Sequence, residues 1–124
     1  KAVISLMGVW DWTDLGVELT GGAPVPDYHK CSAPEPYTEL ARALSPSSYV
    51  DALKTPILIV YSGNDDAVYP SQNIRAIKEL TEAGNPPRVV YLPMDGHMPG
   101  TAESIIETFE AMREFLTERL LEEN

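Results

Sequence analysis

The stretch TPILIVYSGNDDAVYP, residues 55–70, decides the fold. Its first half contains an uninterrupted apolar run at residues 57–61, and its second half contains the adjacent carboxylates Asp65 and Asp66. A short apolar run without polar alternation is typical of a central parallel strand that is covered on both faces. The two aspartates then have two explanations: they form a turn, or one of them is a catalytic acid.

The composition favours a single soluble domain over residues 1–124, because the chain has 124 residues of which 44% are hydrophobic. The longest apolar run is far shorter than the roughly 18 residues that span a bilayer, and the first residues read as a strand and not as a signal peptide. We therefore expect no membrane partner. The net charge of −10 opposes binding to nucleic acid, which requires clustered basic residues.

The single cysteine, Cys31, excludes an internal disulfide and a multi-cysteine metal site. It leaves the redox compartment open and favours a cytoplasmic location. A nucleophile formed by Cys31 and His29 is disfavoured, because two loop residues that close in sequence seldom face each other productively.

The pattern predicts strands at residues 2–7, 56–61 and 88–92, and helices at 35–44, 71–83 and 102–121. Residues 12–36 contain four prolines and should be irregular, and 45–53 should form a turn followed by a helical turn. Strands that alternate with helices indicate an α/β fold with a parallel sheet. Three strands make a small sheet with exposed edges, so we expect the terminal part of a larger sheet.

Apolar spacing predicts which helix faces are buried. In the helix at 71–83 we expect Ile74, Ile77 and Leu80 with Thr81 on the buried side. In the last helix the apolar residues recur at intervals of three and four, as in an amphipathic helix. We expect this stripe to pack on the sheet: Ile105, Phe109, Met112, Leu116 and Leu120.

Chemically useful side chains follow each predicted strand. Residues 10–12 follow the first, Asp65 and Asp66 the second, and Asp95 and His97 the third. The carboxyl ends of parallel strands lie along one edge of a sheet, so these loops should meet. A carboxylate beside a histidine forms two thirds of a nucleophilic triad. An alternative is a metal site, with ligands from Asp65, Asp66, Asp95 and His97.

A family resemblance becomes specific at these segments. TPILIVYSGNDDAVYPSQN, followed by LPMDGHMPG and a long helix, resembles the last third of α/β-hydrolase-fold serine peptidases. The prolyl oligopeptidase family, with its dipeptidyl and acylaminoacyl peptidases, is the most similar. AVISLMGVWDW and ALSPSSYVDALKTP are similar to it as well. The resemblance implies a serine hydrolase that acts on peptide bonds, with a peptide or ester substrate and no cofactor.

The resemblance also implies residue roles. The catalytic acid lies three residues before Val68, which is Asp65, and His97 is the catalytic histidine. Asp66 is then the neighbour that forms the turn by bonding to the backbone. Tyr61-Ser62 stands where relatives commonly have His-Gly, so Asp66 remains an alternative acid. The residues after the first strand, Trp10, Asp11 and Trp12, either line a substrate pocket or pack beneath the irregular segment.

The nucleophile is missing from the chain, because no serine lies in a Gly-x-Ser-x-Gly elbow. We expect the elbow just before residue 1, in an upstream part of the same enzyme, so that this chain alone is inactive. A carboxylesterase or lipase-like hydrolase is an alternative, since the same acid and histidine serve any acyl transfer. A non-catalytic fragment or interaction module, which self-associates through its sheet edge, is another.

Overall fold

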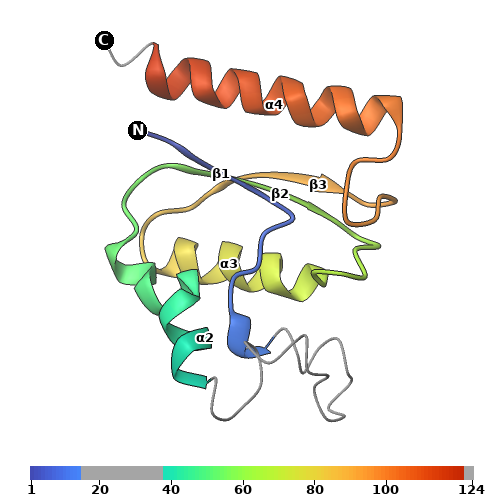
Figure 1. Ribbon diagram of the computed structural model, residues 1–124. Coiled ribbons are helices and arrows are strands. Elements are labelled where there is room, and N and C mark those ends of the chain that lie inside the picture. The colour runs from blue at the N-terminus through green and yellow to red at the C-terminus, as the bar shows by residue number, and fades with distance from the viewer. Residues whose placement is uncertain (15–37, 122–124) are drawn as a thin grey trace.

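A computed structural model describes residues 1–14 and 38–121 (Figure 1). The three strands are parallel in the order β1-β2-β3, with Val3 opposite Ile57 and Val60 opposite Val90. This is the predicted α/β arrangement, with β2 as the central strand. Along the chain the elements are β1 (Val3–Leu6), α2 (Thr38–Leu44), the 3₁₀ helix η2 (Pro46–Ala52), β2 (Ile57–Ser62), α3 (Pro70–Glu82), β3 (Arg88–Leu92) and α4 (Ala102–Leu120).

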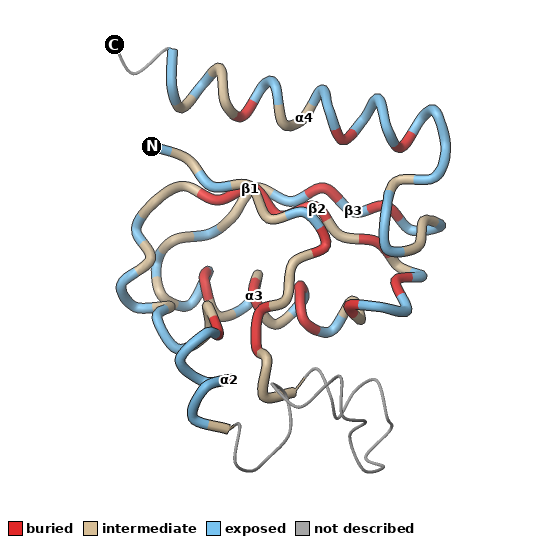
Figure 2. Tube along the Cα trace, in the orientation of Figure 1, coloured by how far each residue is buried: buried red, intermediate tan, exposed pale blue. Residues whose placement is uncertain are grey.

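Helices cover both faces of the sheet, α4 on one side and α3 with η2 on the other (Figure 1). Side chains from β2 alternate between the two faces, which explains why the run has no polar residue until its end. Figure 2 shows the buried residues concentrated on the strands and on the inner sides of the helices. The core beneath α4 contains Met7, Leu58, Val60, Val90, Leu92 and Phe115, and the core beneath α3 contains Trp10, Ile57, Ile59, Ala76 and Leu80.

Helix α3 ends at Glu82, two residues before Gly84, the residue that the sequence predicts as its stop. This glycine adopts a φ of +79°, which residues with a side chain rarely adopt. The N–H of Gly84 donates to the carbonyl of Thr81, and the N–H of Asn85 to that of Leu80. The Asn85 side chain donates to the carbonyls of Leu53 and Thr55 and so holds the helix end against the start of β2.

The predicted buried side of α3 was partly wrong. Ile74 is 54% exposed, and the buried face consists of Gln72, Asn73, Ala76 and Leu80. Hydrogen bonds explain why this face is buried. The Gln72 side-chain oxygen accepts from the backbone N–H groups of Trp10 and Asp11. Apolar spacing could not reveal a face that is buried against a loop.

The prediction for α4 was wrong for most of the stripe. Phe109 is 65% exposed, and Ile105 and Leu120 are also exposed. The face on the sheet instead contains Ser104, Thr108 and Phe115, with Ala111 and Met112 partly buried. The first turn sets this orientation, because Thr101 caps the helix through Ser104, and Ser104 is fixed to the preceding loop.

Most of the predicted irregular segment lies at residues 15–37, outside the described residues, together with His29, Cys31 and the first residues of the predicted helix 35–44. In the part that is described, no helix is long and apolar enough to cross a membrane.

Candidate active site

The loops after β2 and β3 are bonded to each other beyond the ends of the strands. The N–H of Gly63 donates to the Leu92 carbonyl at 3.0 Å, and the N–H of Asn64 donates to the Asp95 carbonyl at 3.1 Å. Asn64 also donates from its side chain to the Met94 carbonyl. These contacts bring the loop with Asp65 beside the loop with His97.

Gly63 permits this approach because it has no side chain. A Cβ at this position would lie 2.5 Å from the Pro93 carbonyl oxygen and 2.7 Å from the Tyr91 hydroxyl. Contacts below 3.0 Å require a shift, and the Pro93 oxygen belongs to the backbone. The glycine therefore allows the two loops to lie in direct contact.

Asp65 is buried and forms the turn that leads into α3. One of its carboxylate oxygens accepts hydrogen bonds from the backbone N–H groups of Ala67 at 2.9 Å and Val68 at 2.8 Å. This is the Asx-type bonding by which an aspartate stabilises a turn. The prediction that Asp66 has the turn-forming role was wrong, since Asp66 is exposed and Asp65 accepts these bonds.

His97 lies against the same carboxylate. Its Nδ1 is 3.1 Å from one oxygen of Asp65 and 3.0 Å from the other. The Asp65 side chain is only 2% exposed, whereas that of His97 is 46% exposed. A buried carboxylate on Nδ1 orients the imidazole and selects the tautomer that carries the proton there. The second ring nitrogen, Nε2, is then the one that can exchange protons with a substrate group.

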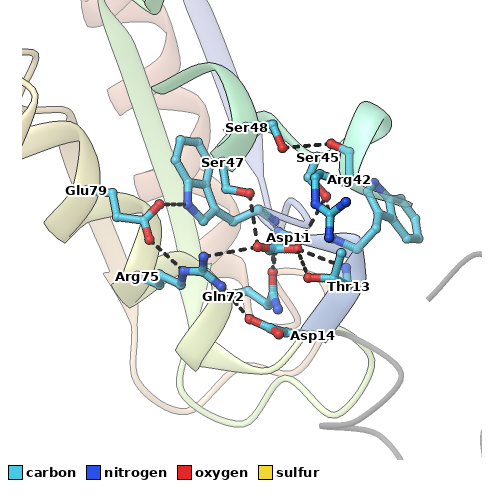
Figure 3. Close-up of polar contacts among 12 residues, drawn as sticks. Asp11, Thr13, Asp14, Arg42, Ser45, Ser47, Ser48, Gln72, Arg75 and Glu79 are labelled. Atoms are coloured by element: carbon cyan, nitrogen blue, oxygen red, sulfur yellow. Dashed lines mark hydrogen bonds and ion pairs between the residues drawn. The ribbon is translucent and has the colours of Figure 1, made fainter. Parts of the chain in front are cut away.

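Trp10, Asp11 and Trp12 lie after β1 and form polar contacts with other elements. Figure 3 shows the network around Asp11. The Trp10 indole N–H donates to Glu79 at 2.6 Å, and the Trp12 backbone N–H donates to Ser45 at 2.9 Å. Trp10 and Asp11 are buried. Their contacts connect the loop after β1 to α3 and η2, and the substrate-binding role stays a prediction.

Asp11 is the centre of that network. It accepts hydrogen bonds from the backbone and side chain of Thr13 and from the Ser47 hydroxyl, and it lies 3.0 Å from Arg75. Burial raises the pKa of Asp11, but the hydrogen bonds from Thr13 and Ser47 and the charge of Arg75 outweigh it and leave the pKa below its ordinary value. Arg75 also pairs with Glu79, and the hydrogen bond to Glu79 raises the pKa of the guanidinium.

The metal alternative finds no support in the described ranges 1–14 and 38–121, where no three histidine, cysteine, aspartate or glutamate side chains converge. Asp95 instead accepts hydrogen bonds from the Gly100 backbone N–H and the Ser104 hydroxyl. Sequence reasoning missed Ser62, whose hydroxyl donates to the Gly96 carbonyl next to His97. Its only signal was the departure from the family pattern at Tyr61-Ser62.

The family is shown by the sequence as a whole. The model of the prolyl oligopeptidase family matches residues 1–123. The chain belongs to the prolyl oligopeptidase family. A comparison with curated protein sequences gives no significant match.

Solved structures share the fold of this family member. An acylaminoacyl peptidase of Pyrococcus horikoshii is 22% identical with a TM-score of 0.80, over 94% of this chain and 19% of its own. Dipeptidyl peptidase 4 of Porphyromonas gingivalis is 19% identical with a TM-score of 0.80, over 97% and 16%. A puromycin-hydrolyzing peptidase of Mycobacterium tuberculosis is 23% identical with a TM-score of 0.74, over 97% and 19%. The chain thus spans about a fifth of the length of these structures and has the α/β-hydrolase fold of such peptidases.

Proposed function

We propose that this chain is the carboxyl-terminal part of a serine peptidase and supplies the aspartate and the histidine of its catalytic triad. The observation that carries the proposal is the contact between the buried Asp65 carboxylate and Nδ1 of His97. The contact lies at the carboxyl ends of two neighbouring parallel strands, where sheets of this type place their reactive groups.

In the proposed reaction, Nε2 of His97 takes the proton from a serine hydroxyl as its oxygen attacks the carbonyl carbon of the substrate. The Asp65 carboxylate stabilises the imidazolium that results and does not itself take the proton. His97 then returns the proton to the leaving amine as the scissile C–N bond breaks. A water molecule hydrolyses the acyl-enzyme by the same two proton transfers.

The serine comes from an upstream segment of the same enzyme, which we place beside β1. The backbone N–H groups of Val3 and Met7 point towards β2, where they donate to the carbonyls of Pro56 and Val60. Because peptide groups alternate along a strand, those of Ile4 and Leu6 point away from β2. β1 is an outer strand of the described sheet, so this edge can accept a further strand.

The surface on the α4 side of that edge is apolar. Arg88 of β3 pairs with Glu114 and Glu118, so these glutamates mark the flank of α4 over β3. By helical spacing, Ile105 and Phe109 lie on the opposite flank, which faces away from β3 and towards the β1 side of the sheet. Both are exposed. An apolar flank of this kind fits an apolar helix of the missing part of the domain.

The surface on the α3 side is hollow. An apolar cavity of about 380 Å³ lies there, lined among others by Val3, Trp10 and Ile57. Asn73 also lines it, and the side-chain nitrogen of this buried residue has no hydrogen-bond acceptor in the described part of the chain. An unpaired buried donor is costly, by about 1–3 kcal/mol. A neighbouring segment that offers a carbonyl oxygen would remove this cost.

A fluorophosphonate probe, which reacts with activated serines, tests the proposal. The 124-residue chain should remain unlabelled, and a longer chain that contains the upstream serine elbow should be labelled. His97→Ala in the longer chain should abolish the labelling. The proposal fails if the longer wild-type chain stays unlabelled, as a non-catalytic module would, or if His97→Ala leaves the labelling intact.

Paired substrates with the same acyl group separate a peptidase from an esterase. An ester has the better leaving group and should be hydrolysed by either enzyme. Hydrolysis of the matched amide or peptide, abolished by His97→Ala, is expected for a peptidase. Hydrolysis of the ester alone would instead assign an esterase.

A further inference from the structure

The loop that carries His97, residues 93–100, is held by hydrogen bonds and not by apolar packing. Its two methionines are exposed, Met94 to 81% and Met98 to 59%. Apolar burial therefore cannot fix the backbone on either side of His97. The polar contacts of the loop must do so.

Besides His97, Asp95 is the residue of this loop whose side chain forms hydrogen bonds. One oxygen of its carboxylate accepts from the Gly100 backbone N–H at 2.6 Å and from the Ser104 hydroxyl at 3.0 Å. The first bond closes a ring of six residues that contains His97. The second attaches that ring to the first turn of α4, which Ser104 and Thr101 cap reciprocally.

The backbone of the same residues is attached to the loop of the catalytic acid. The carbonyls of Met94 and Asp95 accept from Asn64, and the Gly96 carbonyl accepts from the Ser62 hydroxyl. Three successive peptide groups before His97 are thus bonded to the segment that precedes Asp65. The loop is fixed to Asp65 on one side and, through the Asp95 carboxylate, to α4 on the other.

We propose that Asp95 is a positioning residue for His97, and that its two hydrogen bonds hold the imidazole against Asp65. The proposal rests on the proposed function for its catalytic consequence. Its geometric consequence, the contact between Nδ1 and Asp65, does not depend on that function. Ser104 acts in the same way, as the group through which Asp95 is attached to α4.

Kinetics in the full-length enzyme provide the first test. Asp95→Ala should lower kcat by about 10- to 100-fold and leave KM within about threefold, because displacing a catalytic group by about 1 Å costs up to about 100-fold. Asp95→Asn should restore most of kcat, since its side-chain oxygen can accept the same two bonds. Asp51→Ala, at an exposed aspartate of η2, is the matched control and should leave kcat unchanged.

The imidazole signals of His97 provide a second test that needs no activity. The 124-residue chain contains only two histidines, so its ¹⁵N-histidine spectrum can be assigned with His29→Gln. The downfield proton on Nδ1 of His97 should vanish in Asp65→Asn, broaden or shift in Asp95→Ala, and persist in Asp95→Asn. If Asp95→Ala does not fold, Ser104→Ala removes one of the two bonds and should produce the same change to a smaller extent.

Two results would overturn the proposal. One is an unchanged Nδ1 signal in Asp95→Ala together with a kcat within twofold of the wild type. The other is Asp95→Asn as damaging as Asp95→Ala, which would assign the effect to the charge of the carboxylate. An enzyme that never reacts with the probe or with a substrate refutes the proposed function and leaves the spectroscopic test of Asp95 in force.

Discussion

Nδ1 of His97 contacts both carboxylate oxygens of Asp65, at 3.1 and 3.0 Å, while one of those oxygens also accepts from the backbone of Ala67 and Val68. The backbone N–H groups therefore orient the Asp65 carboxylate independently of its contact with His97. An acceptor that is already oriented need not be ordered when the imidazolium forms, which is the property that electrostatic stabilisation of a developing charge requires.

Replacement of Asp65 by asparagine should show how far the reaction depends on this carboxylate. In the full-length enzyme, Asp65→Asn should lower kcat by about a thousand- to ten-thousandfold, because the amide no longer stabilises the imidazolium and allows the wrong tautomer. Steady-state hydrolysis of a peptide substrate measures the loss.

Asp66→Asn is the matched control for that variant, since Asp66 is adjacent in sequence and exposed. Its kcat should remain within about threefold of the wild type. Equal losses in the two variants, or a greater loss in Asp66→Asn, would show that Asp65 is not the acid of the triad.

Replacement of Gly63 by alanine should destabilise the site and the fold together. The added Cβ would meet the Pro93 carbonyl oxygen at 2.5 Å, so the loops after β2 and β3 must move apart. We expect a loss of about 1–3 kcal/mol in the free energy of unfolding, as for other overpacked positions. Urea denaturation measures it. Gly96→Ala is the control, because a Cβ at this position would lie 4.0 Å from the Asn64 carbonyl oxygen, and a loss as large as in Gly63→Ala would contradict the steric explanation.

The Asp11 network predicts a stability difference that depends on pH. Since the pKa of Asp11 is lowered in the folded chain, its contribution is present above the ordinary carboxyl value of about 3.9 and is lost as the pH falls through the folded value. Asp11→Asn should cost about 1–3 kcal/mol at pH 7, because hydrogen bonds to a charged acceptor are lost.

Urea denaturation of wild type and Asp11→Asn between pH 7 and pH 3 measures this difference. The two proteins should approach each other in stability below about pH 4. Asp51→Asn, at an exposed aspartate, should match the wild type at every pH. A gap between wild type and Asp11→Asn that is as large at pH 3 as at pH 7 would show that the ionised carboxylate is not the source.

The apolar flank of α4 predicts self-association of the 124-residue chain, because its exposed apolar side chains favour burial against another copy. The double substitution Ile105→Glu and Phe109→Glu should shift the chain towards the monomer in sedimentation velocity, since both side chains are exposed. Ile74→Glu is the control, at an exposed apolar residue of α3. An equal shift in the control would mean that added negative charge, and not the α4 flank, governs association.

The strands and helices were predictable because each has a strong local signal. The run at residues 57–61 has no polar position, and Gly84 ends α3 in a conformation that favours glycine. The approach of Asp65 to His97 was also predictable, since parallel strands deliver their following loops to one edge. The burial of Gln72 was not predictable, because its side chain bonds to backbone N–H groups of a loop that is distant in sequence.

By itself, the sequence determined the succession of strands and helices along the chain, the family, and the two loops that carry an acid and a histidine, because these follow from local periodicity and motif spacing. Only the tertiary structure decided that Asp65 and not Asp66 lies against His97, since the turn that Asp65 forms orients its carboxylate inward. Only the tertiary structure showed that Phe109 is exposed, because the capped first turn of α4 turns another face to the sheet. Helical spacing identifies an apolar face, and packing alone decides what covers it.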